Sequence, residues 1–293
     1  MKINLGILAS RIRLEEKLLV KEARKRSEIN LTIVDPREFT WDNSNLSELD
    51  VLLDREISQS RAYHIMELLS NTGITLINDF ETVQLCGDKA FTSVKLKKHG
   101  VPTPDFRVAF DRESALKAVE EIGYPAVLKP VDGSWGRMVS KVNNRESAEA
   151  TLEHKSHLDS HYHSIYYVQD FVETGKKDIR AFVIGGEVVG AAYRKSDHWI
   201  TNAARGGESH PYPLTEELET IVSATSDVLG GGALAVDLLE SERGLLINEV
   251  NCSMEFKESM KVIDRDIPAE LLDYTVERAK VGSEEVTQQQ CLV

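Results

Sequence analysis

The sequence predicts a mixed fold, α/β at its amino end and α+β beyond it, with two lobes that face each other. In the opening part, short apolar runs alternate with helical patterns, which is typical of a parallel sheet covered by helices. Residues 99–104, HGVPTP, contain a glycine and two prolines that end a helix. Beyond them the order becomes strand, helix, strand, glycine loop and strand, which indicates a smaller α+β lobe.

Composition and charge exclude several classes of protein. The chain has 293 residues, a formal net charge of −13 and 41% apolar residues. It has no run of the roughly 18 apolar residues that a spanning helix needs and no cleavable leader, so we expect a cytoplasmic protein. The negative charge disfavours non-specific binding of nucleic acid. Cys86, Cys252 and Cys291 are odd in number and far apart, which fits neither a disulfide framework nor a zinc site.

The alternating pattern predicts an N-terminal α/β domain at residues 1–87. The expected strands are 3–9, 31–34, 51–54 and 74–78, and the helices between them include 14–26 and 59–69. A helix that bears Lys89 and Lys95 follows the domain boundary.

Two further lobes are expected, a central lobe at 88–165 and a C-terminal lobe at 166–282. The central lobe is predicted to hold a strand from 106, a helix at 112–122, strands at 125–130 and 138–142, and a helix at 146–155. The C-terminal lobe is predicted to hold strands at 166–171, 179–184, 188–194, 233–239 and 245–250, and helices at 215–228 and 269–279. The histidine-rich segment 154–163 is expected to be a solvated loop, and 283–293, which lacks periodicity, a flexible tail.

Polar residues end two consecutive late strands, and they form the sharpest chemical signal. A hairpin would bring Asp237 close to Glu249 and Asn251. Glu249 and Asn251 are two residues apart and share a face, whereas Asn248 is expected to point away. Two carboxylates and an amide oxygen suit Mg²⁺, which keeps several waters and binds phosphates. The alternative is a pair of ordinary polar strand ends.

A lysine and a glycine loop supply partners for phosphate. Lys129 lies in an apolar strand, where an ammonium group needs an anion to offset its desolvation. The loop that follows has neither the Walker nor the dinucleotide spacing, and alone it reads equally as a β-turn. Its residues are Gly133, Ser134, Trp135, Gly136 and Arg137. Further basic residues, which singly would be surface charge, are Lys89, Arg180, Arg194 and Arg205.

Together these residues resemble the ATP-grasp superfamily, in its RimK-like branch. The segments that carry the resemblance are CGDKAFTSVKL (86–96), YPAVLKPVDGSWGR (124–137), HWITNAARGG (198–207), AVDLLESERGLLINEVN (235–251) and MEFK (254–257). Within the branch, the chain is similar to the ligases LysX and ArgX, which load an amino acid onto the small acidic carrier protein LysW. The resemblance implies an ATP-grasp fold, with an N-terminal pre-ATP-grasp domain and two lobes that clasp ATP, and a homodimer or homotetramer.

The resemblance also implies roles for individual residues. Contacts to ATP are implied for Lys89, Lys129, Gly133, Ser134, Trp135, Gly136, Arg137, Arg180 and Asn202. A hinge that binds the adenine is implied for Gln169, Asp170, Phe171 and Val172. Asp178 is implied to lie near the ribose. Arg194 and Arg205 would steady the γ-phosphate and an acyl phosphate as catalytic groups, and Mg²⁺ would be held by Asp237, Glu249 and Asn251.

The implied reaction is ATP-dependent amide ligation. The terminal glutamate carboxylate of the carrier attacks the γ-phosphate to give an acyl phosphate and ADP, and the amino group of an amino acid then displaces phosphate. In LysX an asparagine-led pair, and in ArgX Gly-Phe, tracks specificity. Glu258-Ser259 occupies that position in this chain and matches neither pair. The loop that contains Arg205 is more similar to that of LysX, so the resemblance favours α-aminoadipate and leaves glutamate open.

Two alternatives stay open beside ligation in lysine or arginine biosynthesis. One is a RimK-like glutamate ligase that acts on another protein tail or on a cofactor, and the other is a non-catalytic nucleotide-binding module. An acidic carrier would also need a local basic patch on an enzyme of net charge −13, for which Arg180, Arg194, Lys195 and Arg205 are candidates.

Overall fold

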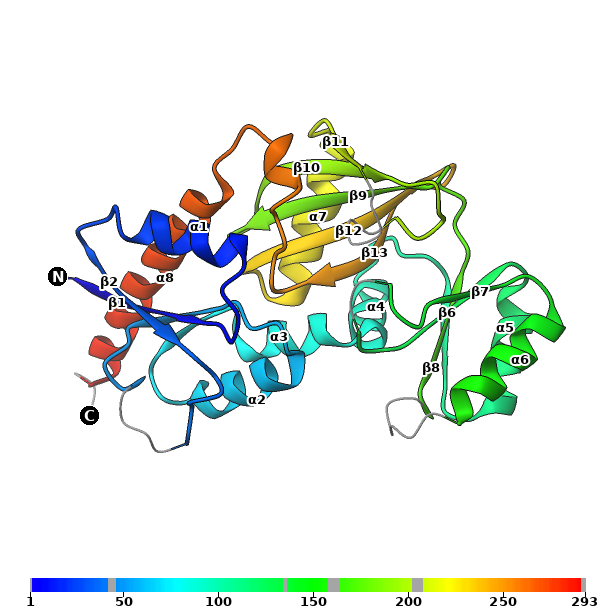
Figure 1. The fold of residues 1–293 in the computed structure, drawn as a ribbon, viewed down its shortest axis with the longest axis horizontal. Coiled ribbons are helices and arrows are strands. Elements are labelled where there is room, and N and C mark those ends of the chain that lie inside the picture. The colour runs from blue at the N-terminus through cyan, green and yellow to red at the C-terminus, as the bar shows by residue number, and fades with distance from the viewer. Residues whose placement is uncertain (1, 42–45, 134–135, 158–163, 202–207, 291–293) are drawn as a thin grey trace.

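A computed structural model of the chain has three parts in a row, as Figure 1 shows. It describes residues 2–41, 46–133, 136–157, 164–201 and 208–290, with the side chains of 283–290 left aside. No helix in these ranges is both long and apolar enough to cross a membrane.

The N-terminal domain is a four-stranded parallel sheet in the order β2-β1-β3-β4, which confirms the predicted α/β class. Its strands are β1 (Ile3–Leu8), β2 (Ile29–Val34), β3 (Val51–Asp54) and β4 (Thr75–Ile77). Its helices are α1 (Leu14–Ala23), α2 (Gln59–Leu69) and α3 (Phe80–Gly87), and α8 (Ile267–Gln290) returns from the end of the chain to pack on it.

The other two sheets are antiparallel, as expected of two facing lobes. The central lobe has the order β5-β8-β6-β7, made of β5 (Phe106–Ala109), β6 (Ala126–Lys129), β7 (Ser140–Val142) and β8 (Tyr166–Asp170), covered by α5 (Arg112–Ile122) and α6 (Arg145–Ser156). The C-terminal lobe has the order β11-β10-β9-β12-β13, made of β9 (Lys177–Ile184), β10 (Glu187–Lys195), β11 (Glu208–Pro211), β12 (Ala233–Ser241) and β13 (Gly244–Asn251), with α7 (Glu216–Leu229) against it. Helix α4 (Lys89–Lys98) links the first domain to the central lobe.

Three expectations about these elements differ from the structure. The sequence predicts that strand β8 belongs to the C-terminal lobe. In the structure β8 pairs with β5 and β6 and so belongs to the sheet of the central lobe. Helix α8 runs on to Gln290, where a flexible tail was expected. Gly282 lets this helix approach β4 closely, since a Cβ there would lie 2.3 Å from Thr75 Oγ1. His154 lies in α6, not in a loop, and 158–163 fall outside the described residues.

The hydrophobic cores show which parts of the molecule pack together. One cluster joins the N-terminal sheet to the C-terminal lobe, with Leu5 and Ile7 packed in the same core as Phe182 and Phe256. The central lobe has a core of its own around Val119, Leu128 and Leu152. The first domain and the C-terminal lobe therefore form one packed body, to which the central lobe is attached.

Asn78 connects the two halves of that body. Its Nδ2 donates to the carbonyls of Ala233 and Cys252 at 2.9 Å each, and its Oδ1 accepts from the Ala233 amide at 2.7 Å. The side chain is buried, so it pairs three backbone groups at the ends of β12 and β13 that water cannot reach.

We expect Asn78→Ala to lower the free energy of unfolding by about 2–4 kcal/mol, since it leaves buried backbone groups unpaired. Urea denaturation measures this. The control is Asn30→Ala, which removes one exposed hydrogen bond to Asn4 and should change stability by less than about 0.5 kcal/mol. Equal losses in the two variants would contradict the role of Asn78.

Candidate active site

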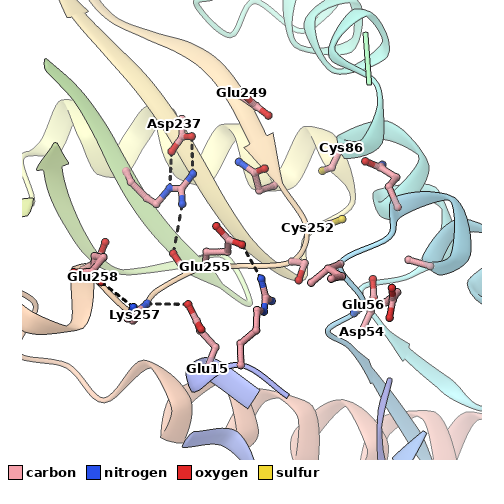
Figure 2. A pocket seen from close by; sticks show the side chains of 18 of the residues that line it. Glu15, Asp54, Glu56, Cys86, Asp237, Glu249, Cys252, Glu255, Lys257 and Glu258 are labelled. Carbon is pink, nitrogen blue, oxygen red and sulfur yellow. Dashed lines mark hydrogen bonds and ion pairs between the residues drawn. The ribbon is translucent and has the colours of Figure 1, made fainter. Parts of the chain in front are cut away.

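Two cavities meet in the C-terminal lobe. The domain cavity, about 500 Å³, lies between the N-terminal domain and the C-terminal lobe, and Figure 2 shows it from close by. The lobe cavity, about 230 Å³, lies between the central and C-terminal lobes. Arg194, Asp237 and Glu249 line both, so these three residues form a common wall.

The β12–β13 hairpin places the predicted metal residues together. Asp237 lies opposite Glu249, and Ala235 opposite Asn251, at the same end of the sheet. A β-bulge between Asp237 and Leu238 adds Asn248 to the other strand. Because of this bulge, Asn248 does not point away as expected: it lines the lobe cavity beside Glu249.

Asp237 is the centre of a buried ionic cluster on three adjacent strands. Its two oxygens accept from Arg180 Nε and Nη2 at 2.7 and 2.8 Å. Arg194 Nη2 lies 3.2 Å from Asp237 Oδ1. Burial would raise the pKa of the Asp237 carboxyl, but Arg180 and Arg194 outweigh it and hold the pKa at about 2. Asp237 therefore stays ionised between its two arginines.

Asp178, expected near the ribose, lines the lobe cavity and binds Arg194. Its Oδ1 accepts from Arg194 Nε at 2.9 Å, and its Oδ2 contacts Arg194 Nη2. Burial would lower the pKa of the Arg194 guanidinium, but Asp237 and Asp178 outweigh it and raise the pKa. Arg180 and Arg194 are enclosed in ion pairs, so the expectation that these two arginines form a basic patch at the mouth of the cleft is wrong. Of the other two candidates for this patch, Lys195 is exposed and Arg205 lies outside the described residues.

Two lysines, Lys89 and Lys129, place positive charge at the lobe cavity. Lys129, at the end of β6, donates from Nζ to Asn248 Oδ1 at 2.8 Å. Burial lowers its pKa to about 8, against the opposing effect of Glu249. Lys89, the first residue of α4, donates to the Gly133 carbonyl at 2.8 Å and lies 3.3 Å from Glu249 Oε1. Among the described residues no carboxylate lies within ion-pair distance of Lys129.

The lobe cavity fits a nucleotide. The hinge residues Gln169, Asp170, Phe171 and Val172 line it, as do Lys89, Lys129, Gly133, Gly136 and Arg137. Gln169 is buried, and within the described ranges its Oε1 has no hydrogen-bond partner, so an acceptor in the lining of the cavity is available to a hydrogen-bond donor of a ligand. Ser134, Trp135 and Asn202 lie outside the described residues.

The oxygen donors fit Mg²⁺ in chemistry. Glu249 and Asn251 point from one face of β13, and the Glu249 side chain is 24% exposed, so a cation can reach its carboxylate. No three His, Cys, Asp or Glu side chains gather as a ready metal site in the described part of the chain. A site here thus needs the Asn251 amide, and Asp237 would share its oxygens with the arginines.

The domain cavity suits a polar ligand and contains, beside the predicted Asn251, groups that sequence reasoning missed. Three buried polar atoms line it and have no hydrogen-bond partner among the described residues: Ser209 Oγ, Asn251 Nδ2 and Ser253 Oγ. Asp54, at the carboxyl end of β3, also lines it, and burial raises the pKa of its carboxyl to about 7. Its position at the carboxyl end of a parallel strand was the available signal.

Glu258 and Ser259, which the resemblance suggests as a specificity pair, also line the domain cavity. Glu258 pairs with Lys257 at 3.3 Å and with Lys261, and Ser259 is buried.

Comparisons with known proteins agree along the chain. A model described as the LysX preATP-grasp domain matches residues 5–85, and one described as the RimK-like ATP-grasp domain matches 86–275. The alpha-aminoadipate–LysW ligase LysX of Saccharolobus solfataricus is 36% identical over 92% of this chain and 99% of that protein. The glutamate–LysW ligase ArgX of Sulfolobus acidocaldarius is 33% identical over 93% and 98%.

Two more distant likenesses extend this picture. The tetrahydromethanopterin:alpha-L-glutamate ligase of Methanococcus maripaludis is 31% identical over 89% of this chain and 94% of that protein. Among solved structures, a RimK domain ATP-grasp protein of Sphaerobacter thermophilus superposes with a TM-score of 0.77 at 25% identity, over 93% of this chain and 99% of that one.

We expect Lys129→Met to weaken ATP binding and to stabilise the ligand-free protein. The folded pKa of Lys129 is about 8 and its ordinary value is 10.5, so the unfolded chain binds more protons between these pH values. The cost of the buried charge is complete below pH 8 and disappears as the pH rises to 10.5.

The melting temperature of the variant should therefore exceed that of the unmodified chain most below pH 8, and the difference should shrink towards pH 10.5. Thermal melts at several pH values and calorimetric titration with ATP measure the two effects. Lys98→Met, at an exposed position of α4, is the control and should change neither. A variant less stable than the unmodified chain at pH 7 would make Lys129 a structural residue.

Proposed function

Because the chain belongs to the RimK-like ATP-grasp family and carries a LysX-type pre-ATP-grasp domain, we propose that it ligates an amino acid to a LysW-type carrier protein. The reaction joins the α-amino group of the amino acid to the side-chain carboxylate of the carrier's terminal glutamate, at the expense of ATP. It belongs to lysine biosynthesis, arginine biosynthesis or both.

The proposal rests on the common wall of the two cavities. A nucleotide in the lobe cavity has Lys89 and Lys129 beside its phosphates, and its γ-phosphoryl group would lie against Arg194. A carboxylate that enters the domain cavity reaches the same wall from the other side. Attack of this carboxylate on the γ-phosphorus gives an acyl phosphate, and ADP leaves.

The amide then forms in the domain cavity. The amine attacks the carbonyl carbon of the acyl phosphate, phosphate leaves, and the amine gives up a proton. The chain contributes charge and position rather than a nucleophile: two lysines and a fixed guanidinium stabilise the oxygens that gain negative charge. When bound, Mg²⁺ adds neutralisation of the phosphate charge, with Glu249, Asn251 and Asp237 as its protein ligands.

The amino acid is α-aminoadipate, with glutamate as a second substrate. Both kinds of relative are similar to this chain at comparable identity, 36% and 33%. A second candidate function is glutamate ligation to a cofactor, which the tetrahydromethanopterin ligase relative favours. ADP release with the carrier and each amino acid in turn, and with a cofactor acceptor and glutamate, distinguishes these possibilities. Turnover only with the cofactor acceptor would overturn the carrier proposal.

We expect Glu249→Gln to lower kcat about 100-fold or more while the chain stays folded, since it weakens a metal ligand whose structural partner is Lys89. Raising Mg²⁺ should restore part of the activity. Glu242→Gln, at the exposed turn of the same hairpin, is the control and should leave kcat within about two-fold. Normal turnover of Glu249→Gln at ordinary Mg²⁺ would remove the metal assignment.

Asp237→Ala is a less direct test of the metal, because it also leaves Arg180 and Arg194 buried without their shared carboxylate.

We expect Glu258→Gly/Ser259→Phe to lower the ratio of kcat/KM for α-aminoadipate over glutamate about 10-fold. Both residues line the domain cavity, and a phenyl ring at the buried 259 position takes up the room of one methylene. Steady-state kinetics with the two amino acids measure the ratio. Glu258→Gln, which keeps the side-chain length, should leave it nearly unchanged. An unaltered ratio in the double variant would mean that specificity is set elsewhere.

A further inference from the structure

A groove outside both cavities runs along helix α1. It has a volume of about 430 Å³, and we call it the α1 groove. Its lining residues are Ile12, Lys17, Val20, Lys21, Arg24 and Ile33. Figure 1 shows α1 and β2 on the side of the molecule away from the central lobe.

The groove is built by one helix face and an edge strand. Positions 17, 20, 21 and 24 recur at the helical spacing and form one continuous face of α1 and the turn after it. Ile33 comes from β2, which has a neighbour on only one side in the sheet order. Ile12 and Ile33 are each 41% exposed, so the groove offers apolar surface to a partner.

The groove is positively charged in an acidic molecule. Lys17, Lys21 and Arg24 are exposed, and in the described part of the chain none has an ion-pair partner. Nearby cations differ, since Arg13 pairs with Glu16 and Glu255, and Lys25 pairs with Glu22. No acidic residue lines the groove, although the chain carries a net charge of −13. Its charge is complementary to carboxylates.

The groove also adjoins the domain cavity. Ile12 lines the groove, and the next two residues, Arg13 and Leu14, line the cavity. Leu14 is 45% exposed, so it lies at the cavity's open side. The groove and the cavity therefore border on consecutive residues of the segment that leads into α1.

We propose that the α1 groove binds the segment of the protein substrate that precedes its terminal glutamate, and that this segment carries carboxylates and an apolar side chain. The inference rests on the proposed function, which requires the end of a protein to enter the domain cavity. The helix face from residue 14 to 24 is about 15 Å long, which an extended segment of about five residues spans. Carboxylates of that segment pair with Lys17, Lys21 and Arg24, and its apolar side chain packs between Val20 and Ile33.

The test compares two charge-reversal variants in a ligation assay with purified LysW-type carrier. Lys17→Glu/Lys21→Glu changes the groove, and Lys98→Glu/Arg112→Glu changes the net charge equally at exposed positions in α4 and α5. We expect the groove variant to raise the KM for the carrier about 10-fold at low salt, with kcat and the KM for ATP within about two-fold. The control variant should keep all three values, and so should Lys17→Arg/Lys21→Arg.

Binding of fluorescently labelled carrier in the absence of ATP gives a second readout, which should show the same loss in the groove variant. An unchanged KM for the carrier, or an equal rise in both glutamate variants, would overturn the inference. So would a change in sedimentation mass of the groove variant with unaltered carrier kinetics, which would make the groove a contact between copies of this chain. Each of these results would leave the proposed function intact if the unmodified chain releases ADP with the carrier. Absence of that release would overturn the proposed function itself, and this inference with it.

Discussion

The buried carboxylate of Asp237, shared by Arg180 and Arg194, is the interaction on which the rest of the site depends. Asp178 completes it, so two arginines and two aspartates on three adjacent strands balance in charge. A buried charge that loses its partner is costly, so each member holds the others in place. The guanidinium groups are therefore fixed before any substrate arrives. Because the cluster is neutral as a whole, the positive charge that attracts a polyanion has to come from other basic residues of the lobe cavity, which include Lys129 and Arg137.

The two lobes meet through polar contacts, whereas the rest of the molecule is joined by apolar packing. Across the lobe cavity, Asn248 accepts from Lys129 and, at 3.3 Å, from Gln169, and Glu249 lies near Lys89. The apolar core of the central lobe is separate from the core that joins the N-terminal domain to the C-terminal lobe. Hydrogen bonds of this kind exchange readily with a ligand, so the cavity can open without loss of a hydrophobic core.

Much of this could be predicted from sequence, because local patterns decide it. Helices α2 and α5 begin and end where periodicity places them, and the hairpin of Asp237 and Glu249 follows from two apolar strands with polar ends. The predictions that failed concern features that depend on residues distant in the sequence. The bulge that turns Asn248 inward and the pairing of β8 with the central lobe are both set by neighbouring strands. The family resemblance supplied the adenine hinge, which no local pattern indicates.

The buried position of Lys129 makes nucleotide binding depend on the pH of the solution. With a pKa of about 8, a fraction of ligand-free molecules carries this lysine uncharged in mildly alkaline buffer. If the nucleotide binds as proposed, a polyphosphate beside Lys129 would favour the ammonium form, so each such molecule would take up a proton on binding. The heat of binding then contains the ionisation heat of the buffer, and affinity declines as the solution becomes more alkaline. The enzyme would thus bind ATP less tightly at alkaline pH, because of Lys129, a residue that takes no part in bond formation.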